Sequence, residues 1–137
     1  PGNLGAMLRT ANAVQVDAVI TSSAVSDVYG PEVVRNSLGG LFATPVVEAK
    51  REDVQGWLLA QGFKTFQMHL EGAESPYQSD LRGRIALVVG AEDQGLDASW
   101  DHAAPHRLKL PMNGLVDSLN VSVAAGVILY EALRQRS

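Results

Sequence analysis

Apolar and polar residues follow one another along this chain in two periods, one typical of helices and one typical of strands. Near the start, Leu4, Leu8 and Ala11 recur at helical spacing and predict a helix over residues 3–13. Further helices are predicted over residues 31–38, 51–61 and 97–103, the last capped by Asp97, and from Ser118 onward. Short apolar or alternating runs predict strands over residues 16–21, 45–48, 64–70, 85–89 and 107–110.

The alternation of strands and helices is typical of the α/β class. We expect a mostly parallel sheet with helices on both faces, formed by one domain over residues 1–137. The continuous apolar run 85–89 predicts the central strand, covered on both faces. The polar, turn-rich segment 71–83 predicts a surface loop.

Composition narrows the classes of protein to consider. Hydrophobic residues make up 46% of the 137 residues and charged residues 19%, as in ordinary globular proteins. The apolar run 121–129 is too short to span a bilayer, and no targeting segment is recognisable. The absence of cysteine excludes a disulfide scaffold and a thiolate metal site. We therefore expect a cytoplasmic protein without a membrane partner.

The net charge of −4, from 11 basic and 15 acidic residues, has the sign opposite to that of most nucleic-acid-binding modules. A role on RNA would therefore use a local basic patch, a second subunit, or a segment absent from this chain.

Residues 110–126 combine a strand end, a loop and a helix start. The strand stops at Pro111, which has no N–H for a ladder, and Asn113 with Gly114 suits a tight turn. Ser118 is placed to cap the following helix, whose first turn carries Asn120. Such a loop presents backbone carbonyls and N–H groups together, which predicts a small-molecule site.

A second loop, Gly-Ala-Glu-Asp-Gln-Gly at residues 90–95, directly follows the run 85–89. It matches neither a dinucleotide fingerprint nor a Walker loop. Its acidic pair, Glu92 and Asp93, would repel a pyrophosphate, so a ligand that lacks phosphate or carries positive charge fits better. The alternative is a tight strand-to-helix turn with solvated carboxylates.

Several single residues have a plain interpretation beside a functional one. Arg9 is by itself a surface arginine, and Ser118 lacks the elbow motif of a nucleophilic serine. His102 and His106 are spaced like metal ligands on a helix, but Pro105 between them favours ordinary histidines. Both tryptophans, at positions 57 and 100, are interpreted as core or interface anchors.

Together, three segments closely resemble the motifs of the SpoU (TrmH-like) methyltransferases of the SPOUT superfamily, and the likeness covers nearly the whole chain. Leu110 stands where the family often has Ile. Family members usually have a strand before the first motif and often a separate RNA-binding domain, and we expect both to be missing from this chain. The matching segments are Asn3-x-Gly5-x-x-x-Arg9-x-Ala11, Leu87-Val88-Val89-Gly90-Ala91-Glu92-x-x-Gly95-Leu96, and Leu110-Pro111-Met112-x-Gly114-x-x-x-Ser118-Leu119-Asn120-Val121-Ser122.

The resemblance implies an α/β domain with a deep trefoil knot at its C-terminal end. In the family the knot loops bind S-adenosylmethionine, and two subunits pack as a homodimer to complete each active site. Carried onto this sequence, Gly90, Leu110 and Leu119 would contact the cofactor through backbone groups, and Met112 would line the same pocket.

The implied reaction is methyl transfer to a ribose 2′-hydroxyl of RNA, with ribosomal RNA favoured over transfer RNA and no metal required. Arg9 takes the catalytic position near the RNA phosphate and the 2′-oxygen. A guanidinium is a poor proton acceptor, so we expect it to stabilise the developing alkoxide. Asn3, Ser118 and Asn120 would orient the ribose and Arg9, while Glu92 would fix Arg9 or another polar group.

Three alternatives stay open from the sequence. The first is a knotted dimer that binds RNA or a small ligand without catalysis, although Arg9, Ser118 and Asn120 in their expected places weigh against it. The second is a serine hydrolase that uses Ser118. The third is a base methyltransferase of another SPOUT branch, which the third motif disfavours.

Overall fold

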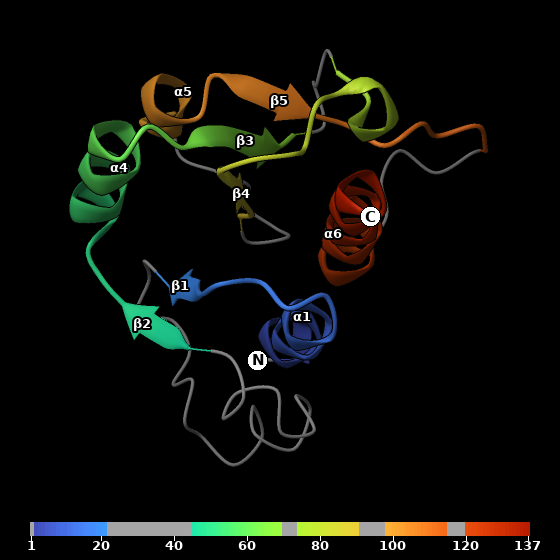
Figure 1. Cartoon of the computed structure of the whole chain (residues 1–137), viewed down its shortest axis with the longest axis horizontal. Coiled ribbons are helices and arrows are strands. Elements are labelled where there is room, and N and C mark those ends of the chain that lie inside the picture. Colours follow the sequence, from blue (N-terminus) through green and yellow to red (C-terminus); the bar gives the residue numbers. More distant parts are fainter. Residues whose placement is uncertain (1, 22–44, 70–73, 91–97, 115–119) are drawn as a thin grey trace. The chain divides into compact units, whose positions relative to one another are not determined.

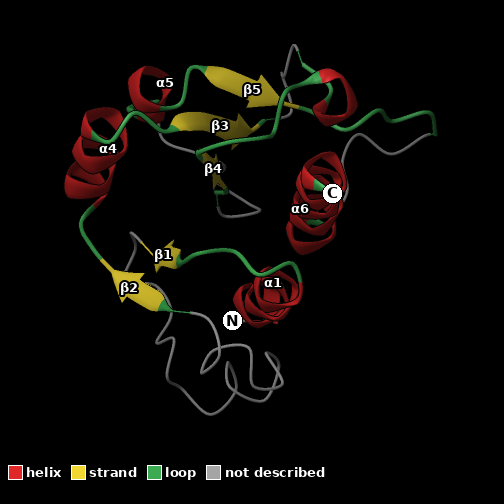
Figure 2. Cartoon of the chain, in the orientation of Figure 1, coloured by secondary structure: helices red, strands yellow, loops and turns green. Residues whose placement is uncertain are grey.

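The computed structural model describes residues 2–21, 45–69, 74–90, 98–114 and 120–137. Figure 1 follows the chain by colour, and Figure 2 separates its helices, strands and loops. The elements in order are α1 (Gly2–Ala13), β1 (Val19–Thr21), β2 (Val46–Glu48), α4 (Arg51–Ala60), β3 (Lys64–Met68), the 3-10 turn η1 (Pro76–Gln78), β4 (Ile85–Val88), α5 (Trp100–Ala103), β5 (His106–Leu108) and α6 (Val121–Arg136).

Most predicted elements are confirmed to within two residues at each end. The helices predicted over 3–13 and 51–61 are α1 and α4, and the strands predicted over 45–48 and 64–70 are β2 and β3. α4 ends at Ala60, and Gly62, the predicted stop, follows it with a φ of +70°, in the left-handed region that favours glycine. The helix predicted over 31–38 lies outside the described residues.

The chain divides into two compact units, of which the first comprises residues 1–54. Its strands β1 and β2 are parallel, with Val19 opposite Val46. Leu8 of α1 is fully buried and packs against both valines. The strand predicted to begin at residue 16 begins only at Val19. The reason is that Gln15, at φ +59°, forms the left-handed end of α1 and the Val16 N–H bonds back to the Ala11 carbonyl.

The second unit, residues 55–137, contains a parallel sheet of order β4-β3-β5. Phe66 of β3 lies opposite Leu87 of β4 and also opposite His106 of β5. The central strand of the described sheet is therefore β3. Within these three described strands, the strand predicted as central, 85–89, has a neighbour on one side only, and all four residues of β4 are half-buried.

Helix α6 closes the core of the second unit. Its buried positions Ala125, Ile128 and Ala132 follow helical spacing. Ile128 and Ala132 pack in one cluster with Phe66, Leu81, Leu108 and Leu110. No helix in the described part of the chain has both the length and the apolar character needed to cross a membrane.

The segment that joins β3 to β4 is only partly the surface loop that its composition predicts: several of its described residues are exposed, but two are buried. Leu81 is fully buried, and so is Pro76 at the start of η1. Glu74 forms a parallel bridge with Leu108, and its carbonyl accepts a hydrogen bond of 2.9 Å from the Lys109 N–H. The described part of this connection is thus anchored to the core at Pro76 and Leu81 and paired with β5 at Glu74.

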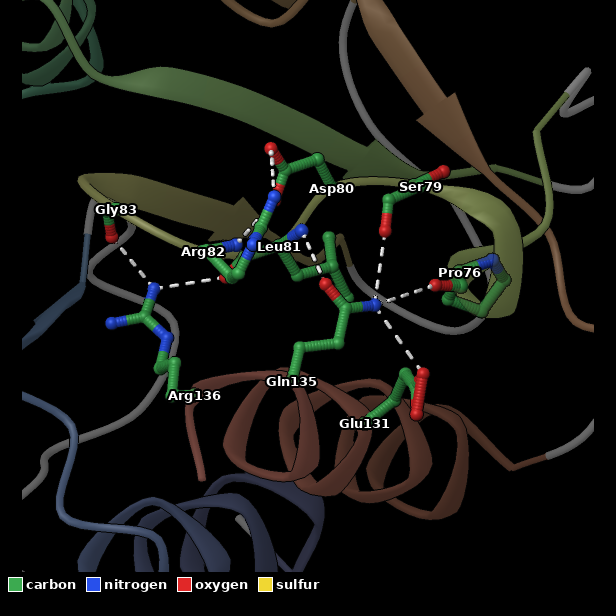
Figure 3. Close-up of polar contacts among 9 residues, drawn as sticks. All are labelled: Pro76, Ser79, Asp80, Leu81, Arg82, Gly83, Glu131, Gln135 and Arg136. Atoms are coloured by element: carbon green, nitrogen blue, oxygen red, sulfur yellow. Dashed lines mark hydrogen bonds and ion pairs between the residues drawn. The ribbon is translucent and has the colours of Figure 1, made fainter.

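The side chain of Gln135, near the end of α6, holds the other side of the same connection (Figure 3). Its Oε1 accepts a 2.7 Å hydrogen bond from the Leu81 N–H, and its Nε2 donates to the Ser79 carbonyl at 2.9 Å. The same Nε2 lies 3.5 Å from the Pro76 carbonyl and 3.3 Å from a Glu131 carboxylate oxygen. The Gln135 amide therefore forms hydrogen bonds with the Leu81 N–H and the Ser79 carbonyl, two backbone groups of the β3–β4 connection.

A polar network lies where β3 meets α5. Gln67 is only 1% exposed, and its Nε2 donates hydrogen bonds of 3.0 Å to the Asp101 carboxylate and to the Ala104 carbonyl. Arg107 also donates to Asp101, at 3.0 Å. The hydrogen bond from Gln67, followed by that from Arg107, lowers the pKa of the Asp101 carboxyl.

This lowered pKa predicts a pH dependence of stability. A carboxyl whose pKa is lower in the folded state stabilises it above the unfolded pKa, and that contribution is lost as the pH falls through the folded value. We expect Asp101→Asn to reduce the loss of unfolding free energy that the wild type shows on acidification below about pH 4, the ordinary range of Asp. Urea unfolding at a series of pH values measures it, and identical pH profiles for the two proteins would contradict the role of Asp101.

Candidate functional site

The ends of three parallel strands in the second unit define the candidate site. Because β4 and β5 both pair with β3 in parallel, their carboxyl ends lie at the same edge of the sheet. Gly90 follows β4 and Leu110 follows β5, each two residues beyond the last residue of its strand. With β3 between them, the two strand ends lie two strand spacings apart, or about 10 Å. We name this side of the sheet, where β4, β3 and β5 end, the carboxyl edge. The distance across it suits a nucleoside-sized molecule.

The backbone at the carboxyl edge has hydrogen-bonding capacity to offer. Within the ranges that the structure describes, no hydrogen bond joins the peptide groups of Gly90, Leu110 or Met112 to another residue. Leu110 is buried, whereas Gly90 and Met112 are half-buried. A ligand at this edge would therefore meet main-chain donors and acceptors next to apolar side chains, the usual character of a small-molecule pocket.

His69 also belongs to the carboxyl edge, and the sequence alone did not identify it as a site residue. It directly follows β3, between the two flanking strands, and its N–H donates a 3.1 Å hydrogen bond to the Leu108 carbonyl. The signal that could have found it is its place one residue after a strand, but that signal needs the sheet order, which puts β3 in the middle.

Asn120, rather than Ser118, is the N-cap of α6. Its Oδ1 accepts a 2.9 Å hydrogen bond from the Ser122 N–H and a 2.6 Å hydrogen bond from the Ser122 hydroxyl. The prediction of Ser118 as the cap was wrong, because Asn120 satisfies the first turn instead. The exposed Asn120 keeps its Nδ2 group, a donor of two hydrogens that the cap does not use.

Three of the predicted site residues, Glu92, Ser118 and Leu119, lie outside the described residues. Asp97, predicted to cap the short helix before β5, lies outside them as well. That helix, α5, begins later than predicted, at Trp100, with Ser99 as the flanking residue. Its predicted end at Ala103 is confirmed.

Arg9 and Asn3 belong to the first unit, where both lie on α1. Arg9 is exposed, while its neighbour Leu8 is fully buried against the β1–β2 pair. The helix thus packs on its apolar face and presents the guanidinium on another face, as the spacing of its apolar residues predicted.

His106 and the two tryptophans have different surroundings in the structure. His106 Nδ1 lies 3.3 Å from a Glu74 carboxylate oxygen, and its ring stacks at a tilt on Phe66. Trp100 is buried, as expected of a core anchor. Trp57, by contrast, remains 47% exposed beside Phe63, with 5.1 Å between the ring centroids. Within the described residues, no group of three His, Asp or Glu side chains is arranged to hold a metal ion.

Comparison with known proteins gives consistent matches over almost the entire chain. The model of the SpoU rRNA Methylase family matches residues 1–130. A 23S rRNA (guanosine-2′-O-)-methyltransferase RlmB from Xanthomonas campestris is 39% identical over 141 residues, covering 99% of this chain and 55% of that protein. The chain spans about half the length of the curated relatives it matches first.

Two solved structures show that the likeness extends to the fold. The SpoU methyltransferase AviRb from Streptomyces viridochromogenes, solved with the cofactor AdoMet, superposes with a TM-score of 0.92 at 33% identity, over 99% of this chain and 54% of that one. A chain solved for insight into 2-OH methylation of C/U34 on tRNA superposes with a TM-score of 0.87 at 30% identity, over 99% of this chain and 89% of that one.

Proposed function

The chain belongs to the SpoU rRNA Methylase family, and on that premise we propose that it transfers a methyl group from S-adenosylmethionine to a ribose 2′-hydroxyl of RNA. The observation that carries the proposal is the carboxyl edge, where Gly90 and Leu110 end two parallel strands on either side of β3. The second and third family motifs fall at this edge. AviRb, solved with AdoMet, has the same fold, which supports S-adenosylmethionine as the cofactor.

The residues of the carboxyl edge fit this cofactor. Gly90, Leu110 and Leu119 would bind it through backbone groups, and Met112 would line the pocket. The unpaired peptide groups described above suit the adenine and ribose edges, and the half-buried Gly90 allows close approach. When bound, S-adenosylmethionine supplies a methyl group already activated on a sulfonium. The protein then has to align the acceptor hydroxyl and stabilise its charge.

Arg9 is the proposed catalytic residue. Its guanidinium carries a fixed positive charge and five donors, which suit an RNA phosphate and the 2′-oxygen as that oxygen develops negative charge. Asn3, Ser118 and Asn120 orient the ribose and the arginine, and the Nδ2 group of Asn120 is available for that purpose. Glu92 fixes Arg9 or another polar group. The proposal includes no metal, because the methyl group needs no further activation.

The proposed fold includes a deep trefoil knot at the C-terminal end. Two sets of contacts support it, both within the second unit. The β3–β4 connection pairs with β5 through Glu74 and Leu108, and it also bonds to the end of α6 through Gln135. Elements from the last third of the chain thus contact this connection on two sides, an arrangement that the proposed knot would also contain. We also propose that the protein acts as a homodimer and that it does so in the cytoplasm.

Ribosomal RNA is the favoured substrate, because the first curated relatives are named 23S rRNA 2′-O-methyltransferases. Transfer RNA is the second candidate. One comparison favours it: a solved chain that concerns 2-OH methylation of C/U34 on tRNA superposes on this chain with a TM-score of 0.87 at 30% identity. Incubation with tritiated S-adenosylmethionine and each purified RNA, followed by digestion to nucleosides, separates them. Label in 2′-O-methyl nucleosides supports the proposal, and label on a base or in neither RNA contradicts it.

Substitution of Gly90 tests the cofactor site itself. Gly90→Val adds a branched side chain at the close approach and is expected to weaken S-adenosylmethionine binding more than about tenfold, or roughly 1.4 kcal/mol. Isothermal titration calorimetry measures it. The control is Gly56→Ala, at a position where an added Cβ meets no atom within 4 Å. Wild-type affinity in a folded Gly90→Val protein would exclude Gly90 from the site.

A further inference from the structure

The opposite edge of the second unit's sheet, where the strands begin, carries a concentration of positive charge. Lys64 opens β3, and its N–H bonds to the carbonyl of Arg84, which precedes β4. Arg136, at the end of α6, donates to the Leu81 and Gly83 carbonyls at 3.0 and 2.7 Å, so its guanidinium lies against the turn before β4 (Figure 3). Asp80 is paired with Arg82 at 2.9 Å.

Aromatic side chains extend this charged edge. The Arg84 guanidinium carbon lies 5.4 Å from the centroid of the Phe63 ring, and Phe63 in turn packs against the half-exposed Trp57. The amino-edge surface, as we name it, comprises the cations Lys64, Arg82, Arg84 and Arg136, the carboxylate Asp80, and the aromatic residues Trp57 and Phe63.

The amino-edge surface is positively charged, although the chain as a whole is negatively charged. The described amino-edge surface has four cationic side chains and one carboxylate, whereas the whole sequence has a net charge of −4. Cations that follow a strand edge beside an exposed tryptophan are the combination that binds a single-stranded nucleic acid, through phosphates and a stacked base. A single strand offers both a phosphate for each cation and a free base for the ring, whereas a duplex would not offer a free base to it.

We propose that the amino-edge surface is an RNA-binding site, which holds a single-stranded segment of the substrate on the side of the sheet away from the cofactor. The inference rests on the proposed function, because it names where the same RNA continues beyond the methylated nucleotide. Lys64 and Arg84 contact phosphates, and Trp57 stacks on a base. This surface supplies the local basic patch that an acidic chain needs to act on RNA.

The test measures the affinity of the intact protein for a fluorescently labelled oligouridine over a range of salt concentrations. Each phosphate contact on a single strand contributes about 0.7 to the slope of log K against log salt. The double variant Lys64→Gln with Arg84→Gln is therefore expected to lower the slope by about 1.4 and to weaken binding at 0.1 M salt by roughly tenfold or more. Lys50→Gln, at an exposed lysine outside the surface, is the control and keeps the wild-type slope.

Trp57 provides a second readout. Stacking of a base on its ring quenches its fluorescence, and Trp57→Leu removes that quenching while the buried Trp100 still reports that the fold is intact. The melting temperature of each variant identifies one that fails to fold. A folded double variant that keeps both the wild-type slope and the quenching overturns the proposal.

The outcomes also separate this proposal from the proposed function. A wild type that methylates RNA beside a double variant with unchanged RNA affinity overturns the amino-edge site alone. A wild type without methyl transfer beside a double variant with lost RNA affinity overturns the methyltransferase proposal alone. A change in oligomeric state by sedimentation, with unchanged RNA affinity, would assign the surface to a second protein copy and overturn its role in RNA binding.

Discussion

Replacement of Arg9 by alanine is expected to lower the rate of methyl transfer by about 100- to 1000-fold, the usual effect of losing one donor to a developing oxyanion. The affinity for S-adenosylmethionine should stay near the wild-type value, because the cofactor is assigned to the carboxyl edge of the second unit. Arg9 is exposed on a helix that packs through another face, at Leu8, so the variant should also fold. Single-turnover transfer of a tritiated methyl group and calorimetry with the cofactor measure the two quantities.

Two further variants sharpen this test. Arg9→Lys keeps the charge but loses the planar fork of donors, and an intermediate rate would show that donor geometry contributes. Thr10→Ala changes the neighbouring position of the same helix and should transfer methyl groups at the wild-type rate. A folded Arg9→Ala protein that loses cofactor affinity, or that keeps full activity, would remove Arg9 from its catalytic role.

Replacement of Gln135 by leucine is expected to lower the free energy of unfolding by about 2–4 kcal/mol. The substitution leaves the Leu81 N–H and the Ser79 carbonyl without their partner, and an unpaired buried polar group costs about 1–3 kcal/mol. Such a loss is a large part of the total stability of a typical domain, about 5–15 kcal/mol. Urea unfolding followed by circular dichroism measures it.

The matched control for Gln135 is Gln78, an exposed residue of η1 in the same connection. Gln78→Leu should change the unfolding free energy by no more than about 0.5 kcal/mol. Gln135→Glu keeps an acceptor for the Leu81 N–H but removes the donor and places a second carboxylate next to Glu131. It should therefore be as harmful as leucine. Equal stability of Gln135→Leu and Gln78→Leu would contradict the role of the Gln135 amide.

The sequence predicted best where structure depends on neighbouring residues. The helical spacing of Leu4, Leu8 and Ala11 was sufficient to predict α1, and Gly62 marked the end of α4. The parallel α/β class followed from the order of strands and helices, which the structure confirms for the described sheets. Gly90 was identified as the position after one predicted strand and Leu110 as the end of another, and the register places both at one edge.

The failures have a common cause in contacts between distant parts of the chain. β3 was not expected at the centre because its buried Gln67 looks like a solvent-facing residue, and its partner, the Ala104 carbonyl, lies 37 residues away. The segment before β4 was expected to lie wholly on the surface because it is polar and rich in turn formers. Its burial at Leu81 was missed because the Leu81 N–H bonds to Gln135, more than 50 residues later. No local pattern reports such pairs.

The start of α6 shows a different limit. Ser118, Asn120 and Ser122 are all residues that cap helices, and they stand within five positions of one another. The sequence alone does not choose among them, since the choice depends on where the preceding loop leaves the chain. The structure selects Asn120, whose Oδ1 binds both the N–H and the hydroxyl of Ser122.

The most direct test of the central claim is a map of 2′-O-methylated positions in total cellular RNA, made with and without the gene for the intact protein. At least one ribose methylation, in ribosomal RNA, is expected to disappear with the gene. It should return with the wild-type protein and stay absent with Arg9→Ala. Identical maps with and without the gene, or a lost modification that lies on a base, would contradict the assignment of this chain as an RNA ribose methyltransferase.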